Sequence, residues 1–205
     1  MSASPATKPI EFFFDFSSPY GYLASTQIEA IAAKHDRQVA WRPILLGAIF
    51  KVSGAGPLTE APLKGAYSRR DMERSARLRQ IPYAWPAVFP FSTVAACRAF
   101  SVVEETDPAA AVALAKALYH AALGVGGDIA APEAVLAIAR AIGLDTDSLA
   151  AGMQDPRIKQ RVKEINDAAI GREIFGSPFF IVDGEPFWGA DRLEQVDRWL
   201  ATGGW

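Results

Sequence analysis

The pattern of apolar and polar residues divides the chain into two strand-bearing ends and a helical middle. At the front, the apolar run 12–16, interrupted only by Asp15, predicts a short buried strand. Apolar residues recur at helical spacing over 19–35, and 38–46 predicts a second strand. Pro43 cannot donate to a strand ladder, which places this second strand at an edge or a bulge. Such a strand–helix–strand unit is normally parallel with a right-handed crossover.

The middle of the chain has a helical pattern. Residues 53–57 and 60–62 are typical loop formers, and a polar helix is predicted over 64–80. From residue 93 to residue 173 alanine is frequent and apolar residues recur three and four positions apart. This spacing predicts helices that form core and scaffold. Their boundaries are expected at Asp107-Pro108, Asp155-Pro156 and Gly143.

The end of the chain returns to a strand pattern. Residues 179–182 and 185–188 predict two strands, joined by a tight Asp-Gly turn. A last helix is expected over 189–200. Asp191 with Glu194 three residues later predicts a capping box at its start.

These elements together follow the plan of a thioredoxin fold. We therefore expect an α/β protein with a thioredoxin-like fold and a large all-helical insertion between the second and third strands. The thioredoxin-like domain would be discontinuous, over 11–46 and 176–201. The helical insertion domain would span 47–175, and residues 1–10 would form a flexible N-terminus.

Composition and charge narrow the classes of function. The chain has 205 residues, half of them hydrophobic, which is enough for one well-packed domain with an insertion. A formal net charge of −2 and a pI near 5.7 argue against nucleic acid and against anionic membranes as partners. No apolar signal segment and no run of about 18 apolar residues is present, so we expect a soluble, cytoplasmic protein.

Cysteine and histidine are scarce. The single cysteine, Cys97, excludes an internal disulfide and a Cys-x-x-Cys redox pair. With only His35 and His120 besides, the sequence offers no ligand spacing typical of a metal site. Redox and zinc chemistry by the chain's own residues are therefore not expected.

The turn after the first strand is the first candidate for chemistry. Ser18 and Pro19 are typical of an N-cap and a first helical position. The free N–H groups and the dipole of a helix start favour an anion above Ser18, and a thiolate is an anion. Serine is a weak nucleophile without an adjacent base, although sequence distance leaves a triad with His35 or His120 open. From these residues alone, Ser18 is either a helix cap or a site.

Ser18 can instead donate a hydrogen bond to an external thiolate. The pKa of a free thiol is about 8.5, so a site that keeps the thiolate at neutral pH must lower this pKa by a unit or two. Each unit corresponds to about 1.4 kcal/mol of stabilisation of the thiolate over the thiol. A helix N-terminus contributes about 0.3–2 kcal/mol and a hydrogen bond to a charged group about 1.5–3 kcal/mol. The helix N-terminus and the hydrogen bond together are enough to lower the thiol pKa by the required one or two units.

Two further segments offer binding residues. Lys64 lies at the start of the polar helix, where a cation opposes the dipole and an anionic ligand would explain it. The other basic residues of this helix are typical of a solvated face. Segment 81–92 contains three prolines and four aromatic residues, and it forms either a rigid wall of a flat aromatic pocket or a loop packed on helices. Tyr20, Trp85 and Phe89 are the residues expected in such a substrate pocket.

Five segments in this order resemble the 2-hydroxychromene-2-carboxylate isomerases and the kappa-class glutathione transferases, whose fold is related to the DsbA oxidoreductases. They are Phe14-Asp-Phe-Ser-Ser-Pro-Tyr-Gly-Tyr-Leu23, Lys64-Gly-Ala-Tyr-Ser-Arg-Arg-Asp71, Phe89-Pro90, Phe175-Gly-Ser-Pro178 and Trp188-Gly-Ala-Asp-Arg192. The resemblance extends from about residue 11 to residue 200. It implies glutathione as cosubstrate and a homodimer.

The resemblance also implies roles for particular residues. Ser18 matches the serine that contacts the glutathione sulfur, and Ser177 matches the residue whose backbone pairs with the cysteinyl unit. Pro178 stands where the fold carries its cis-proline. The segment implied to hold the γ-glutamyl end consists of Trp188, Gly189, Ala190, Asp191 and Arg192, with Asp191 facing the ammonium group. Lys64 matches a lysine near an anionic group of ligand or substrate.

The chain departs from the family pattern at two positions near the pocket. The family often has asparagine where this chain has Ala55, and Asn-Thr where it has Ser92-Thr93. These departures bear on the substrate more than on glutathione.

We therefore expect a glutathione-dependent isomerase of 2-hydroxychromene-2-carboxylate-type intermediates of aromatic degradation, in which a thiolate adds reversibly, a bond rotates and the thiolate leaves. The expected partners are glutathione and a small aromatic carboxylate. The alternatives are a kappa-like transferase that conjugates electrophiles and a non-catalytic thioredoxin-fold binding protein. A dithiol oxidoreductase is the weakest alternative, because Ser18 and Gly21 occupy the positions of the cysteine pair.

Overall fold

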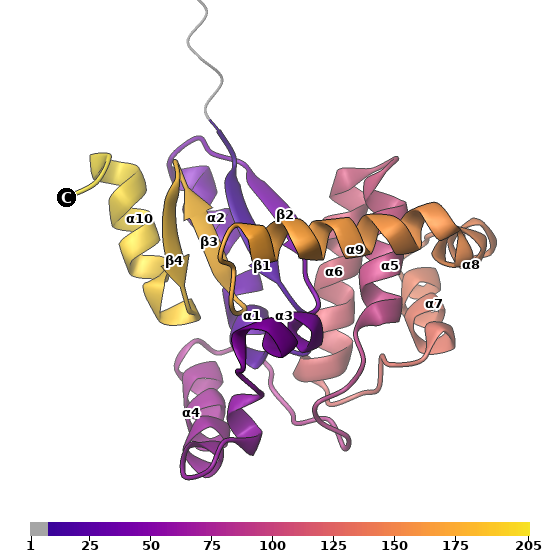
Figure 1. Ribbon diagram of the computed structural model, residues 1–205, viewed down its shortest axis with the longest axis horizontal. Helices are drawn as coiled ribbons and strands as arrows, with labels where there is room; N and C mark the ends of the chain where they lie inside the picture. The colour runs from indigo at the N-terminus through magenta and orange to yellow at the C-terminus, as the bar shows by residue number, and fades with distance from the viewer. Residues whose placement is uncertain (1–7) are drawn as a thin grey trace, which may run out of the picture.

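A computed structural model describes residues 8–205 of the chain, and its centre is a mixed four-stranded sheet (Figure 1). The strands are β1 (Ile10–Phe14), β2 (Val39–Pro43), β3 (Phe179–Val182) and β4 (Glu185–Trp188), in the order β2-β1-β3-β4. β1 pairs with β2 in parallel and with β3 in antiparallel fashion, and β3 pairs with β4 in antiparallel fashion. The predicted parallel front unit is confirmed, and the strand that contains Pro43 lies at an edge of the sheet as expected.

Besides the four strands, the described residues form ten α-helices. They are α1 (Pro19–Ser25), α2 (Ile28–Lys34), α3 (Leu46–Ser53), α4 (Lys64–Leu78), α5 (Val94–Glu104), α6 (Pro108–Tyr119), α7 (Pro132–Ala141), α8 (Thr146–Gln154), α9 (Pro156–Gly171) and α10 (Leu193–Thr202). Short 3₁₀ turns cover Leu58–Glu60 and Ala190–Arg192, and a π-helical turn covers His120–Gly124. The order of elements confirms a thioredoxin-like fold with a helical insertion between the second and third strands.

The two faces of the sheet bury different residues. Phe12 and Phe14 of β1 point to one face and share a continuous core with Phe100 of α5 and Tyr119 of α6. Phe13 points to the opposite face, where it packs with residues of α3 and α9. Because β1 is covered on both faces, its sequence is a continuous apolar run rather than an alternating pattern. Figure 1 shows α9 crossing this second face and α4 extending from the end of the sheet.

The first strand lies at Ile10–Phe14, two residues earlier than the predicted 12–16. Two further predicted elements also have different boundaries in the structure. The single helix expected over 19–35 is two helices, because the side chains of Thr26 and Gln27 both donate to the carbonyl of Leu23 and interrupt the backbone ladder. The strand expected over 38–46 ends at Pro43, and α3 begins at Leu46. The prediction missed α3 altogether.

The last helix also begins differently. The predicted capping box is wrong, because α10 begins at Leu193 with Arg192 at its N-cap and no side-chain capping bond. Asp191 lies in the preceding 3₁₀ turn instead. The helix continues to Thr202, two residues beyond the expected end.

The predicted domain division stays a prediction. Residues 1–7 of the expected flexible N-terminus lie outside the described residues, whereas Ile10 is buried and already belongs to β1. One hydrophobic core contains side chains of the sheet together with Leu114 and Leu118 of the insertion. The insertion therefore packs directly on the thioredoxin-like part.

Candidate active site

Strand pairing brings three separate segments to one end of the sheet. β1 and β2 are parallel with Phe14 opposite Pro43, so the residues after both strands emerge at the same end. β3 is antiparallel to β1 with Phe179 opposite Phe13, so the residues before β3 reach that end as well. The Ser18 turn, the start of α3 and the loop before β3 therefore lie next to one another.

A cavity of about 1000 Å³ opens at this end. Its lining comes from the Ser18 turn, α3, the 3₁₀ turn after α3, α4, segment 85–94, the loop before β3 and the end of β4. Most of the lining residues are apolar or aromatic, with several serine and threonine hydroxyls between them. The volume suits a flat organic molecule together with part of a peptide.

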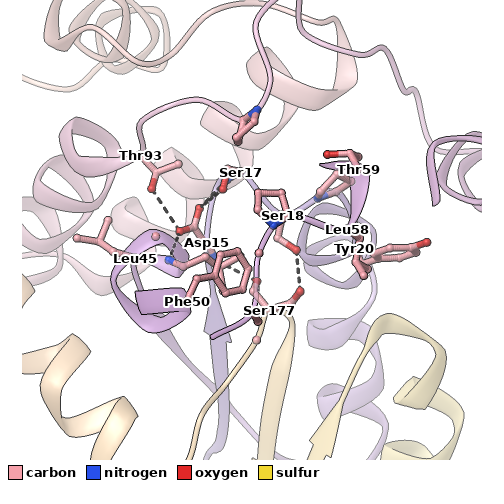
Figure 2. A pocket seen from close by; sticks show the side chains of 18 of the residues that line it. Asp15, Ser17, Ser18, Tyr20, Leu45, Phe50, Leu58, Thr59, Thr93 and Ser177 are labelled. Atoms are coloured by element: carbon pink, nitrogen blue, oxygen red, sulfur yellow. Dashed lines mark hydrogen bonds between the residues drawn. The ribbon is translucent and has the colours of Figure 1, made fainter. Parts of the chain in front are cut away.

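The floor of this cavity consists of Asp15, Ser17, Ser18 and Ser177 (Figure 2). The Ser18 Oγ donates to the carbonyl oxygen of Ser177 over 2.7 Å and accepts from the N–H of Gly21 over 3.0 Å. Ser18 is therefore the N-cap of α1, as predicted, and it is only 5% exposed. Its hydroxyl has one proton, which rotation about the Cβ–Oγ bond can redirect from the Ser177 carbonyl to a ligand atom.

Asp15 forms hydrogen bonds with several neighbouring segments of the floor. Its carboxylate accepts from the N–H and the hydroxyl of Ser17 over 2.7 and 2.8 Å, and from the N–H of Leu46 over 2.7 Å. A longer bond of 3.4 Å comes from the Thr93 hydroxyl, and the Asp15 N–H donates to the Ser177 Oγ. Burial raises the pKa of Asp15, while these donors oppose the rise by favouring the ionised form. One buried carboxylate thus connects the end of β1 to the starts of α3 and α5.

Gly21 is enclosed by the same group. A Cβ atom at this position would lie 2.7 Å from the Tyr119 hydroxyl and 2.9 Å from the Ser177 Oγ. The Tyr119 hydroxyl is held there by donating to the Asp15 carbonyl over 2.9 Å. No side chain fits at position 21 without displacing the floor, so a cysteine in the second position of a redox pair would not fit either.

The expected aromatic residues of the substrate pocket line the cavity. Trp85 meets Phe89 edge to face with ring centres 5.1 Å apart. The guanidinium of Arg69 lies 4.6 Å from the centre of the Trp85 ring, and the indole N–H donates to Glu73 over 3.2 Å. Segment 81–92 therefore both borders the cavity and packs on α4, so the two alternatives left open by the sequence are combined.

Tyr20, the third expected pocket residue, also lines the cavity. Its hydroxyl donates to Asp71 of α4 over 2.8 Å, and Figure 2 shows its ring at the edge of the cavity. α4 thus supports the pocket through both Tyr20 and Trp85.

The Ser177-Pro178 peptide is cis, in the place where a thioredoxin fold carries its cis-proline. The carbonyl of Pro178 accepts from the N–H of Gly189 over 3.0 Å. Gly189 has a φ of 108°, a conformation that favours glycine. This bond connects the loop before β3 to the segment implied to hold the γ-glutamyl group.

The remaining expected ligand residues lie at or beyond the rim. Trp188 lines the cavity and is about half exposed, and Ala190 is buried. Asp191 and Arg192 are exposed and pair with each other over 3.3 Å. Lys64, the first residue of α4, is exposed and is not part of the cavity lining. The roles of these residues toward glutathione stay predictions.

Several lining residues were missed by the prediction. Phe50 and Lys51 line the cavity from α3, and Thr59 lines it from the 3₁₀ turn that follows. The Thr59 hydroxyl oxygen is buried without a hydrogen-bond partner among residues 8–205. A signal for α3 was present, because Leu46, Ile49 and Phe50 have the three-and-four spacing of a helix.

The structure also bears on a histidine base, on the cysteine thiol and on metal binding. His35 pairs with Asp197 over 2.6 Å, and neither His35 nor His120 lines the cavity, so Ser18 has no histidine base among the described residues. Cys97 is fully buried, and burial raises the pKa of its thiol well above the ordinary value. No three His, Cys, Asp or Glu side chains within 8–205 are grouped as metal ligands. Over the same residues, none of the helices combines the length and the apolar character that crossing a bilayer requires.

Comparison with known proteins gives a consistent picture. The family model of the DSBA-like thioredoxin domain matches residues 9–201. The 2-hydroxychromene-2-carboxylate isomerase of Sphingobium xenophagum is 30% identical over 196 residues, covering 95% of this chain and 98% of that protein. Glutathione S-transferase kappa 1 of Homo sapiens is 27% identical, covering 96% of this chain and 94% of that protein.

Solved structures agree with the sequence comparisons. A 2-hydroxychromene-2-carboxylate isomerase superposes with a TM-score of 0.83 at 26% identity, over 95% of each chain. The cytosolic disulfide reductase DsbM from Pseudomonas aeruginosa, solved with glutathione, superposes with a TM-score of 0.66 at 17% identity, which shows the common fold.

Proposed function

The chain belongs to the DSBA-like thioredoxin domain family, among the 2-hydroxychromene-2-carboxylate isomerases and kappa-class glutathione transferases, and we propose that it is a glutathione-dependent isomerase. The proposed substrates are 2-hydroxychromene-2-carboxylate-type intermediates of aromatic degradation. The observation that carries the proposal is the contact between the Ser18 hydroxyl and the Ser177 carbonyl at the floor of a large, mainly apolar cavity.

In this proposal the floor receives the cysteinyl unit of glutathione. The backbone of Ser177 would pair with that unit, and the adjacent Ser18 hydroxyl would then be within reach of the sulfur. Ser18 would exchange its bond to the Ser177 carbonyl for a bond to the thiolate, while the Gly21 N–H continues to orient its oxygen. A hydrogen bond to an anion contributes about 1.5–3 kcal/mol, which lowers a thiol pKa by about one to two units.

The remaining contacts to glutathione are proposed from the resemblance. Segment 188–192 would hold the γ-glutamyl end, and Lys64 would lie near an anionic group. Trp188 at the rim and the bond between Gly189 and Pro178 support this placement, because they join that segment to the floor.

The cavity would hold the aromatic substrate above the floor. When bound, glutathione would supply the thiolate for reversible addition to the conjugated substrate, with rotation about the former double bond before the thiolate leaves. Trp85 and Phe89 would provide flat apolar contact to the ring system. Ser18 would keep the sulfur ionised before addition and after elimination, and the mainly apolar lining would offer few polar groups to hold water beside it.

A direct assay tests the proposal. The protein is incubated with 2-hydroxychromene-2-carboxylate, with and without glutathione, and the ultraviolet spectrum is followed. We expect conversion that depends on glutathione and leaves its concentration unchanged. If the spectrum does not change with glutathione present, the substrate assignment is wrong.

The second candidate is a kappa-like transferase, which the similarity to kappa-class enzymes favours. Its floor would act in the same way, but the thioether would be released as product. Chlorodinitrobenzene distinguishes the two, since only a transferase consumes one glutathione per turnover. The third alternative, a non-catalytic binding protein, predicts no heat of glutathione binding in calorimetry.

Two further expectations accompany the proposal. We place the protein in the cytoplasm, where glutathione keeps thiols reduced. The homodimer implied by the resemblance is checked by light scattering of the full chain, which should give about twice the mass of one chain.

A further inference from the structure

Tyr119, the last residue of α6, reaches the active-site floor from the helical insertion. Its side chain is fully buried, and the centre of its ring lies 5.9, 5.2 and 5.9 Å from those of Phe14, Phe16 and Tyr22. The chain continues directly as the π-helical turn His120–Gly124, a distortion that is common at functional sites. Because three aromatic neighbours surround the ring, the position of its hydroxyl is fixed.

The Tyr119 hydroxyl shares its acceptor with the Ser18 turn. It donates to the carbonyl oxygen of Asp15 over 2.9 Å, and the same oxygen accepts from the backbone N–H of Ser18 over 2.8 Å. A carbonyl oxygen has two lone pairs, so both bonds are made together. Tyr119 therefore holds one end of the turn whose other end carries the proposed donor to the thiolate.

The same hydroxyl also lies against the first turn of α1. It is 2.7 Å from the position that a Cβ atom would take at Gly21, and the N–H of Gly21 donates to the Ser18 Oγ. Tyr119 thus borders both backbone groups that place the Ser18 side chain. Among the described residues, none from α6 lines the cavity, so Tyr119 can act on a ligand only through the floor.

Tyr119 keeps its proton over the pH range in which a thiol titrates. Burial raises the pKa of Tyr119 well above its ordinary value, the nearby Asp15 and Cys97 add to the rise, and the Ser177 hydroxyl opposes it. The hydroxyl therefore donates to the Asp15 carbonyl at every pH at which bound glutathione would change its charge. Any effect of Tyr119 on the thiol must come from the position of the floor and not from ionisation of the tyrosine.

We propose that Tyr119 is a positioning residue: by its bond to the Asp15 carbonyl it holds the Ser18 turn where the Ser18 hydroxyl reaches the glutathione sulfur. This inference rests on the proposed function and gives the helical insertion a part in the same site. The sequence pattern had indicated only core and scaffold for these helices. A donor stabilises an anion fully only when its supporting residues hold it in place, and Tyr119 is such a support.

The first test compares Tyr119→Phe with Tyr22→Phe. Tyr22 is a matched control, because it is also buried and its hydroxyl donates to the carbonyl of Pro82 over 3.0 Å, outside the floor. Each substitution removes one bond from a phenol to a carbonyl and keeps the ring. The thiol pKa of bound glutathione is measured by thiolate absorbance against pH.

We expect the bound thiol pKa to rise by about 0.5–1 unit in Tyr119→Phe, since a neutral hydrogen bond and one pKa unit have similar free energies. In Tyr22→Phe it should stay at the wild-type value. The Kd for glutathione, measured by calorimetry below the thiol pKa, should change by less than about twofold in both variants, because the neutral thiol is then the bound form. A merely structural tyrosine would lower stability without moving the thiol pKa.

Amide hydrogen exchange of the ligand-free protein gives a test that does not depend on glutathione. Loss of the bond to Asp15 should let the Ser18 turn open more often, so the amides of Ser18 and Gly21 should exchange about fivefold faster in Tyr119→Phe. Tyr22→Phe should leave both rates near those of the wild type. If the wild type showed no lowered thiol pKa, the proposed function would fail, and these exchange rates would still decide whether Tyr119 holds the turn.

Two outcomes would overturn the proposal. An unchanged thiol pKa in Tyr119→Phe, with the wild-type value lowered, would show that the floor places Ser18 without Tyr119. Equal acceleration of exchange at Ser18 in Tyr119→Phe and Tyr22→Phe would show a general loosening of the aromatic core instead of a specific support.

Discussion

The floor of the cavity and its outer wall, formed by Phe50, Lys51, Leu58 and Thr59, are built in opposite ways. Floor residues from three chain segments bond to one another, and Ser18 uses both its donor and its acceptor. In the outer wall, Lys51 has no ion-pair partner and the Thr59 hydroxyl has no hydrogen-bond partner within 8–205. Under the proposed function, the floor would fix one atom of the constant ligand, glutathione, and the outer wall would contact the variable one, the substrate.

The largest effect is expected from Ser18→Ala. It removes the only side-chain donor proposed for the thiolate, and loss of one such donor costs about 10²–10³ in rate. We expect kcat/KM for the chromene substrate to fall by about that factor, with a smaller loss of stability because a helix cap is also removed. Ser17→Ala is the matched control, since the neighbouring hydroxyl donates to Asp15 instead. An equal fall in both variants would mean that the whole floor, and not Ser18, had been disturbed.

Gly21→Ala should have the second largest effect. The added Cβ would overlap the Tyr119 hydroxyl and the Ser177 Oγ, and such overpacking costs about 1–3 kcal/mol. Chemical denaturation should show that loss, together with weaker glutathione binding. At Gly171, the last residue of α9, a Cβ meets no atom within 4 Å, so Gly171→Ala should be neutral or slightly stabilising. If Gly21→Ala were as stable as Gly171→Ala, the floor would be looser than the structure shows.

Asp15→Asn should alter the pH dependence of stability. Because burial raises the pKa of Asp15 in the folded state, the unfolded chain loses this proton first as pH rises from acid. The contribution of Asp15 to stability is therefore complete below the unfolded pKa of about 3.9 and declines as pH rises through the folded pKa. The free energy of unfolding of the wild type minus that of Asp15→Asn should decrease over this window. An increase would mean that the hydrogen-bond donors outweigh burial.

Thr59→Val should have the smallest effect on stability, and any change should be a gain where the other variants lose stability. A buried hydroxyl without a partner costs free energy, so its replacement by a methyl group of the same shape should leave the protein as stable or up to about 1 kcal/mol more stable. Thermal unfolding measures this. A clear loss of stability would show that the Thr59 hydroxyl is satisfied after all, and that the outer wall resembles the floor.

The strands and the floor differ in how far the sequence predicts them. Apolar runs identified all four strands, and the turn at Ser18 was correctly assigned as a helix cap. These features depend on residues close together in the chain. The split between α1 and α2 was missed, because no proline or glycine marks it and local side-chain bonds to Leu23 cause it.

The chemistry of the floor could be predicted only in part. The resemblance identified Ser18, Ser177 and Trp188, and the structure brings all three to one cavity. The role of Asp15 was not predicted, because its partners Leu46 and Thr93 are 31 and 78 residues away. Lys51 was missed with α3, since the apolar residues before it continue the strand pattern of β2.

In the proposed function, Ser18 holds the glutathione sulfur as a thiolate. The most direct measurement is the pKa of the bound glutathione thiol, followed by thiolate absorbance against pH in the wild type and in Ser18→Ala. We predict a wild-type pKa at least about one unit below the free value of about 8.5, and a rise of about one to two units in the variant. The same thiol pKa in both proteins would contradict the account and leave Ser18 as a helix cap only.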